Sequence, residues 1–186
     1  MIGMRDKGIT LVELLVVISI VCILALAVVF EYKDWIGKYR VEAQIREMHL
    51  DLINARVRAM LRKRVHFVSL AQTHYTVQED IYPWPDGDRY LTATDSVRPA
   101  GYSDPIPLLQ KNLSRDLPLT WNNIRVAHIR FNERGFSNTN RTICVNTDRK
   151  ADYDCIAISA ARIRLGRLKK KIPDGGICNS ENCVMR

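Results

Sequence analysis

The chain has 186 residues, a net charge of +8 at pH 7, 47% hydrophobic residues and 26% charged residues. This length favours one globular domain, and the apolar content excludes a wholly disordered chain because it can build a core. The positive charge is concentrated near the C-terminus, where residues 162–171 hold six cations and no acidic residue.

Residues 9–30 form an almost uninterrupted apolar segment behind a short N-terminal leader, and Glu13 is the one charged residue among them. As a helix rising about 1.5 Å per residue, this segment is long enough to cross a bilayer. A cleaved secretory signal peptide is the alternative, but no A-x-A-like site follows and charged helical sequence continues directly. We therefore expect a single membrane-spanning helix.

The segment from Lys7 to Leu14, KGITLVEL, resembles the class III signal of type IV prepilins. In that family a membrane-bound prepilin peptidase cuts after the glycine on the cytoplasmic side and methylates the new N-terminus. The resemblance implies a leader peptide of residues 1–8, cleaved and methylated at Gly8 and Ile9. Phenylalanine usually stands at the position of Ile9, so the sequence departs from the family there.

Glu13 lies inside the predicted span, where a carboxylate is costly and normally needs a partner. It follows Ile9 by four residues and therefore lies one turn further along the same helix face. In pilins the equivalent glutamate is assigned a contact with the N-terminal ammonium of a neighbouring subunit. The resemblance thus implies that Glu13 acts in assembly, and snorkelling to the membrane edge is the alternative.

Residues 31–64 continue the helix in amphipathic form. Their apolar residues recur at spacings of four and three, which predicts one helix face packed on a core. That face consists of Val41, Ile45, Met48, Leu52, Ala55 and Ala59. Basic residues crowd the end of the helix, and we interpret them as a solvated end that compensates the helix dipole. They are Arg56, Arg58, Arg62, Lys63 and Arg64.

Residues 65–186 are predicted to form an antiparallel β head. Alternating apolar and polar residues between turn-forming residues predict the strands. We place them at residues 65–70, 75–78, 124–131, 142–145, 155–159 and 162–165. Residues 80–120 are rich in proline and read mainly as loops, with one short strand at 89–94. The fold class is α+β and pilin-like, with a long N-terminal helix packed on an antiparallel β-sheet.

Four of the five cysteines lie in the head, which predicts two disulfides in an oxidising periplasm. We favour the local pairs, Cys144 with Cys155 and Cys178 with Cys183, and crossed pairing stays open. Zinc binding is the alternative, but the spacing lacks a C-x2-C pair. Cys22 lies in the span and is expected to be inert.

The stretches 131–145 and 158–164 are similar to the FimT-like minor pilins and the H-type pseudopilins of type II secretion. That family often ends its head with a Ser-x-Gly-Arg-x-Arg strand. Ala161 stands here at the glycine position, while Arg162 and Arg164 match. Some FimT-like members bind DNA through this segment during natural transformation.

The charge pattern after residue 161 permits the same role. We expect a bulge at Gly166 to place Arg167 and Lys169 on the same strand face as Arg162 and Arg164. The resulting positive surface would contact the phosphates of a nucleic acid without recognising its bases. A solvated strand, or a patch that pairs with acidic neighbours in the fibre, is the alternative. The cations are Arg162, Arg164, Arg167, Lys169, Lys170 and Lys171.

Enzyme motifs are absent from the sequence. The four histidines lie in no nucleophile, metal or phosphate-loop motif, and the acidic residues of 80–95 lack EF-hand spacing. We expect no catalysis, no metal and no cofactor.

The sequence therefore predicts a minor pilin of a type IV pilus that supports fibre initiation and assembly, and DNA binding for uptake stays open as an additional role. An H-type pseudopilin of a type II secretion pseudopilus is one alternative, and a protein that is mainly a non-specific DNA receptor is another. The expected partners are other pilin or pseudopilin subunits, the prepilin peptidase, the inner membrane and DNA. The protein would span the inner membrane once, with a cytoplasmic N-terminus and a periplasmic head, before entering the fibre.

Overall fold

The structure, a computed structural model, describes residues 10–83, 87–96, 100–101, 106–123, 127–137 and 139–185. The cleavage positions Gly8 and Ile9 lie outside these residues. The chain divides into two compact units, one ending at Gly37 and the other beginning at Lys38.

One helix, α1, spans Leu11–Arg62. It begins there because the hydroxyl of Thr10 accepts a hydrogen bond from the backbone N–H of Glu13 at 3.2 Å, the geometry of an N-terminal cap. It ends because Lys63 adopts a left-handed backbone with φ of 55°, which stops the helical hydrogen-bond ladder.

The first unit contains the apolar part of α1. Every large apolar side chain between Leu11 and Leu26 is at least half exposed within the structure. Among the described residues, no helix contains an apolar stretch that is long enough to cross a membrane.

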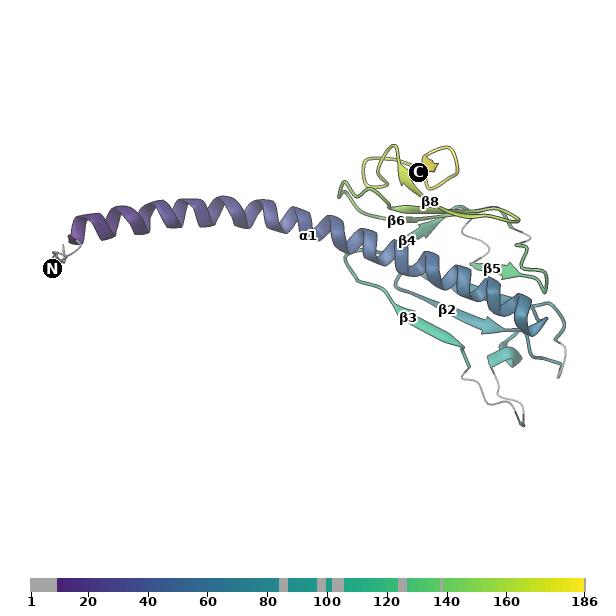
Figure 1. Cartoon of the computed structure of the whole chain (residues 1–186). Coiled ribbons are helices and arrows are strands. Elements are labelled where there is room, and N and C mark those ends of the chain that lie inside the picture. The colour runs from purple at the N-terminus through teal and green to yellow at the C-terminus, as the bar shows by residue number, and fades with distance from the viewer. Residues whose placement is uncertain are drawn as a thin grey trace, which may run out of the picture. The chain divides into compact units, whose positions relative to one another are not determined.

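The second unit is the head, and the part of α1 from Lys38 onward packs against its strands (Figure 1). All six residues of the predicted apolar stripe, from Val41 to Ala59, are at most 1% exposed. They join strand residues from both sheets in one hydrophobic cluster, which confirms the predicted core face of the helix.

The first sheet has the strand order β3-β2-β1-β5 and all of its pairs are antiparallel. Its strands, in chain order, are β1 (His66–Leu70), β2 (His74–Glu79), β3 (Leu109–Asn112) and β5 (His128–Phe131). A short 3-10 helix, η1 (Ala93–Ser96), lies between β2 and β3 in the chain.

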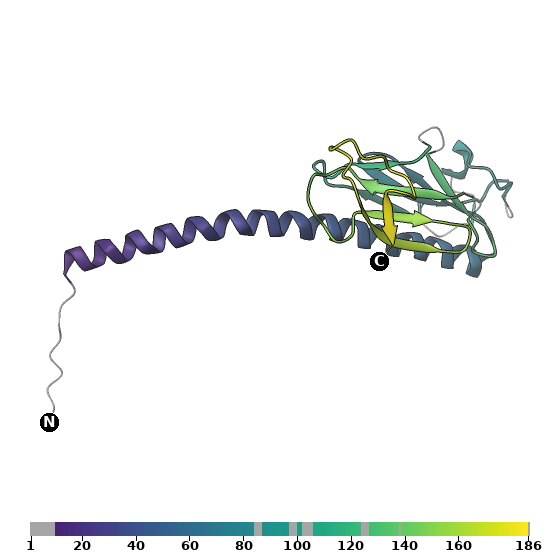
Figure 2. The same ribbon diagram turned by 90° about the horizontal axis from the view of Figure 1, so that it is seen from above.

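The second sheet has the order β4-β6-β7-β8-β9, again antiparallel throughout. Its strands are β4 (Leu119–Trp121), β6 (Arg141–Val145), β7 (Cys155–Ile158), β8 (Ile163–Leu168) and β9 (Cys183–Met185). The C-terminal segment lies on the side of this sheet that faces away from α1 (Figure 1), and Figure 2 shows the strands from above.

The α+β class is confirmed, and the head differs from the prediction in its details. It contains two sheets, and β3, β4 and β9 are strands that the sequence pattern did not predict. The strand predicted at 89–94 is wrong, because this segment bends and then enters η1. The strand predicted at 124–131 begins at His128, and residues 124–126 lie outside the described residues.

Candidate functional site

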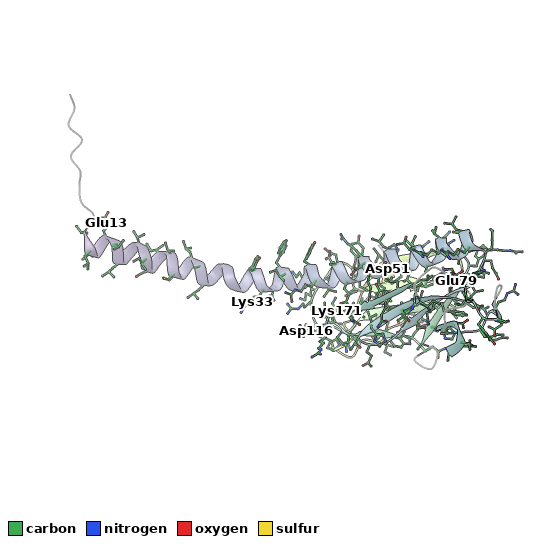
Figure 3. The ribbon with its side chains drawn as sticks, turned by 90° about the horizontal axis from the view of Figure 1, so that it is seen from below. Glu13, Lys33, Asp51, Glu79, Asp116 and Lys171 are labelled. Carbon is green, nitrogen blue, oxygen red and sulfur yellow. A yellow bond between two sulfur atoms is a disulfide. The ribbon has the colours of Figure 1, made fainter. Side chains whose placement is uncertain are left out.

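Glu13 lies in the first turn of α1, near its N-terminal end (Figure 3). The spacing Thr10-x-x-Glu13 is that of a capping box, in which a glutamate at the third helical position supports the start of a helix. Its carboxylate is also near the positive end of the helix dipole. These local interactions place a negative charge beside the N-terminus of α1, where the sequence predicts an assembly contact.

The basic segment begins in β8, whose residues alternate between the two faces of the sheet without a bulge. The register runs one for one, with Ala157 opposite Arg164, Cys155 opposite Gly166 and Leu168 opposite Cys183. Arg164 therefore lies on the outer face, which bears the C-terminal segment, and Arg167 lies on the other face. The bulge predicted at Gly166 is wrong, and the cations of β8 do not share one face.

Gly166 has a different role from the predicted one. A Cβ atom at this position would lie 2.7 Å from the carbonyl oxygen of Val184 and 2.8 Å from the Sγ of Cys183. Neither atom can move easily, since one belongs to the backbone of β9 and the other to a disulfide. Glycine is therefore required for the close approach of β9 to β8.

The head contains two disulfides, as predicted, but their pairing differs from the favoured one. Cys144 is bonded to Cys178, and Cys155 is bonded to Cys183. Together with Leu168, these cysteines form a small second hydrophobic cluster. The two bonds fasten the C-terminal segment to the outer face of the second sheet at β6 and β7.

Lys171 is a buried cation, unlike the exposed Lys169 and Lys170. It is 8% exposed, and its Nζ forms an ion pair with the fully buried carboxylate of Asp154. The other carboxylate oxygen of Asp154 accepts a hydrogen bond from the backbone N–H of Leu168 at 2.7 Å. Lys171 (Figure 3) is thus a structural residue that holds the C-terminal segment.

Arg162 and Arg164 line a pocket of about 360 Å³ at the end of the second sheet where β7 turns into β8. Both side chains are exposed, and neither forms an ion pair with any residue that the structure describes. Arg141, 3% exposed, lines the same pocket, and burial lowers the pKa of its guanidinium. Amide and hydroxyl side chains complete the polar lining: Asn122, Asn140, Thr142, Ser159 and Ser180.

The remaining predicted cations line a different hollow, of about 560 Å³. Lys169 and Lys170 are exposed there, whereas Arg167 lies 3.8 Å from the carboxylate of Asp152. Asp148 and Asp174 also line this hollow, so its charge is mixed. The single surface predicted from the sequence is therefore two surfaces, and the one at Arg162 and Arg164 has no acidic residue among its described lining residues.

The basic end of α1 is not simply solvated. Arg62 and Arg64 lie 3.3 Å and 3.2 Å from the two carboxylate oxygens of Glu79, whose side chain is 1% exposed. Arg56 donates a hydrogen bond to the carbonyl of Ala161 at 2.8 Å. This helix end joins β2 and the β7–β8 turn, a role that the sequence did not reveal.

The loop after β2 holds a buried carboxylate, Asp80. Its oxygens accept hydrogen bonds from the backbone N–H groups of Asp88 and Arg89. Burial, and to a smaller extent the nearby charge of Asp95, raise the pKa of Asp80 to about 6. Within the described part of the chain, no group of three or more histidine, cysteine or acidic side chains is placed to hold a metal ion.

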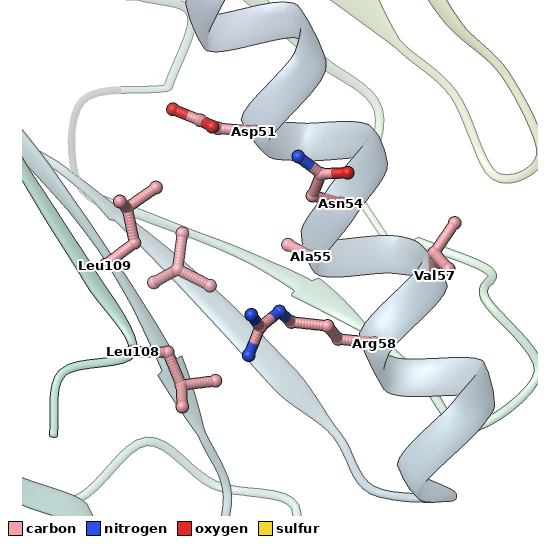
Figure 4. A pocket seen from close by; sticks show the side chains of 8 residues that line it. Asp51, Asn54, Ala55, Val57, Arg58, Leu108 and Leu109 are labelled. Atoms are coloured by element: carbon pink, nitrogen blue, oxygen red, sulfur yellow. The ribbon is translucent and has the colours of Figure 1, made fainter. Parts of the chain in front are cut away.

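A third pocket, of about 340 Å³, lies between α1 and strands of the first sheet (Figure 4). Asp51 lines it and accepts a hydrogen bond from the hydroxyl of Tyr75 at 2.6 Å, while Lys111 lies 3.2 Å from the same carboxylate. Burial raises the pKa of Tyr75 above its ordinary value. These polar groups satisfy one another and connect α1 to the first sheet.

The sequence identified Arg162 and Arg164 but missed the rest of their pocket. Arg141 and Asn140 belong to β6 and the residues before it, and Asn122 follows β4. No local motif marks them, because they approach the arginines only through the strand order β4-β6-β7-β8. The one local sequence signal for this pocket is Arg141, a charged residue at the start of the buried strand β6.

Residues 3–29 match the family model of the prokaryotic N-terminal methylation motif. A comparison with curated protein sequences finds no match. Among solved structures, the Pseudomonas aeruginosa type IV minor pilin FimU is similar at 20% identity, with a TM-score of 0.49, 69% of this chain covered and 90% of FimU covered. The minor pseudopilin EpsH of the Vibrio cholerae type 2 secretion system is similar at 11% identity, with a TM-score of 0.48. That match covers 69% of this chain and 97% of EpsH. These structural likenesses are too low to carry any argument.

The methylation motif is followed by a helix that starts at Leu11, and the later part of that helix packs on an antiparallel β head. Both features are those expected from the N-terminal signal. The chain thus carries the prokaryotic N-terminal methylation motif at residues 3–29 and has an α+β fold in which a long helix packs on an antiparallel β head.

Proposed function

We propose that this protein is a minor pilin that enters a type IV pilus and supports its initiation and assembly. Its leader, residues 1–8, is removed by the prepilin peptidase at Gly8, and Ile9 becomes the methylated N-terminus. Residues 9–30 hold the protein in the inner membrane, with its head in the periplasm, until it joins other pilin subunits.

One observation carries this proposal: the methylation motif covers residues 3–29, and the helix from Leu11 to Leu26 within it exposes its large apolar side chains. A helix that is hydrophobic on every side needs a lipid or protein environment. Successive burial in a membrane and in a bundle of pilin helices meets this need. An H-type pseudopilin would use the same helix, so the genes for a pilus or a secretion system nearby distinguish these two functions.

Replacement of Glu13 tests the assembly role. The Glu13→Ala variant makes the predicted span more apolar, so we expect it to be inserted and cleaved normally. It should enter fibres less than the unmodified protein, because the N-terminal ammonium of a neighbouring subunit loses its carboxylate partner. The measurement is its amount in sheared fibres relative to the membrane fraction.

Glu181→Ala is the matched control, since Glu181 is an exposed glutamate in the head and its loss removes the same charge. It should leave the amount in sheared fibres unchanged. Equal recovery of the Glu13→Ala and Glu181→Ala variants from fibres would contradict the assembly role of Glu13.

DNA binding is a second proposed function, favoured by the two exposed arginines, Arg162 and Arg164, that have no carboxylate partner among the described residues. A duplex that also reaches Lys169 and Lys170 in the second hollow would make about four phosphate contacts in all. Binding to random-sequence duplex DNA should then fall with salt, with a slope of log K against log salt of about −3.6.

The double variant Arg162→Gln/Arg164→Gln should flatten this slope by about 1.8, since two contacts are lost. The control is Arg115→Gln/Arg134→Gln, which removes the same charge from exposed positions elsewhere in the head. Equal effects of the two double variants would show a diffuse charge effect and contradict a DNA site at Arg162 and Arg164.

A further inference from the structure

The pocket at Arg162 and Arg164 is hollow because of the residues at its base. Thr142 on β6 and Ala157 on β7 are partners in the strand register, and Arg164 on β8 is the next partner in the same row. Two small side chains therefore stand beside a long one on the outer face of the sheet. The C-terminal segment borders this row through Ser180 and Met185, leaving a volume of about 360 Å³.

The pocket offers hydrogen-bond donors and positive charge. Arg162 and Arg164 contribute two exposed guanidinium groups, and none of the described lining residues carries a carboxylate. The Oδ1 of Asn122 is occupied, because it accepts a hydrogen bond from the backbone N–H of Thr142 at 2.8 Å. The side-chain NH2 group of Asn122 is therefore a donor that it can offer a ligand. Two cations with amide and hydroxyl donors select an anion that has several oxygens.

We infer that this pocket binds a phosphate monoester, in its dianionic form, in preference to an internal phosphodiester. A monoester carries a charge of about −1.5 to −2 at pH 7, whereas a phosphodiester carries a single negative charge. Guanidinium groups also pair with phosphate oxygens in a bidentate manner. The volume of this pocket, about 360 Å³, lies at the lower end of the usual range of about 300–1,000 Å³ for ligand pockets, so it suits one terminal phosphate group.

This inference rests on the proposed anion-binding role of Arg162 and Arg164, and it specifies the ligand of that site. A phosphorylated end of a nucleic acid strand and free inorganic phosphate share the required chemistry. Both present a dianionic phosphate that can enter a hollow, whereas the continuous backbone of a duplex runs along a surface.

The test uses the purified full chain in detergent and a short single-stranded oligonucleotide labelled at its 3′ end. Fluorescence anisotropy compares the 5′-phosphorylated strand with the same strand ending in a 5′-hydroxyl. We expect the phosphorylated strand to bind at least about tenfold more tightly, the factor that one charge-assisted hydrogen bond supplies. The preference should shrink from pH 7.5 to pH 5.5, because the second proton of a phosphate monoester binds with a pKa of about 6.

The Arg162→Gln/Arg164→Gln variant should lose this preference, and Arg115→Gln/Arg134→Gln should retain it. Inorganic phosphate serves as a competitor: if it displaces the phosphorylated strand, the free ion is a ligand, and if it does not, the strand end is the ligand. Either result supports the inference as long as the preference is present.

Equal affinity for the two strands, or a preference that survives in Arg162→Gln/Arg164→Gln, would overturn the inference. Closed circular duplex DNA, which has no 5′ end, separates this failure from that of the proposed DNA binding. Salt-sensitive binding of closed circles through Arg162 and Arg164 without a 5′-phosphate preference leaves DNA binding intact and refutes the monoester pocket. A 5′-phosphate preference without binding of closed circles supports the pocket and refutes binding along the duplex.

Discussion

Cys144 and Cys155 lie directly opposite each other in the register of β6 and β7, yet each forms its disulfide with the C-terminal segment. The cysteines of adjacent strands both face outward, toward Cys178 and Cys183, and not toward each other. The result is a C-terminal segment that is fastened twice to the second sheet, beside the pocket that contains Arg162 and Arg164.

This pairing predicts the outcome of peptide mapping without reduction. The peptide containing Cys144 should be linked to the one containing Cys178, and the peptide containing Cys155 to the one containing Cys183. Mass spectrometry of the digested protein identifies the linked peptides. A link between Cys144 and Cys155 would contradict the arrangement of the C-terminal segment.

The buried ion pair between Lys171 and Asp154 predicts a large loss of stability when the cation alone is removed. The Lys171→Met variant leaves the carboxylate of Asp154 buried without its partner, which costs about 3–5 kcal/mol. Chemical denaturation of the purified chain measures this change in the free energy of unfolding.

Two further variants make this prediction specific. Lys170→Met is the matched control, since Lys170 is exposed, and its effect should stay within about 0.5 kcal/mol. Combining Lys171→Met with Asp154→Asn should recover part of the loss, because no unpaired charge remains buried. A loss below about 1 kcal/mol in Lys171→Met would refute the buried pair.

The raised pKa of Asp80 predicts that the free energy of unfolding of the head depends on pH in the acidic range. The folded chain holds the proton of this carboxyl with a pKa of about 6, against 3.8 for an ordinary aspartate. The folded state therefore binds more protons between these values, so the free energy of unfolding falls as the pH rises from about 4 to about 6, by about 3 kcal/mol at most.

The Asp80→Asn variant cannot lose this proton, so it should lack this component of the pH dependence. Denaturation curves at pH 4, 5, 6 and 7 compare the two proteins. The same pH dependence in both would show that Asp80 does not titrate as its burial requires.

The sequence predicted the helix and the core face well because both depend on local periodicity. The spacing from Val41 to Ala59 shows which helix face is buried, whatever covers it. The sequence did not predict the strands β3, β4 and β9, because each has only three or four residues. They become strands through hydrogen bonds to a neighbouring strand.

The candidate site was predicted only in part, for the same reason. Arg162 and Arg164 stand out in the sequence as part of a cationic run. Nothing local distinguishes Lys171 from Lys170, although one is buried beside Asp154 and the other is exposed. The face of Arg167 depends on whether Gly166 forms a bulge, and the contact with β9 decided that. Such contacts are long-range and are fixed by the packed fold.

We propose that this chain is a prepilin whose leader is removed between Gly8 and Ile9. The most direct test is the mass of the membrane-bound protein when it is expressed with a prepilin peptidase. We expect a protein that has lost residues 1–8 and gained one methyl group at Ile9. The Gly8→Val variant should keep its leader, because a branched side chain obstructs cleavage there. A membrane-bound protein that retains residues 1–8, or a Gly8→Val variant that loses them, would contradict the claim.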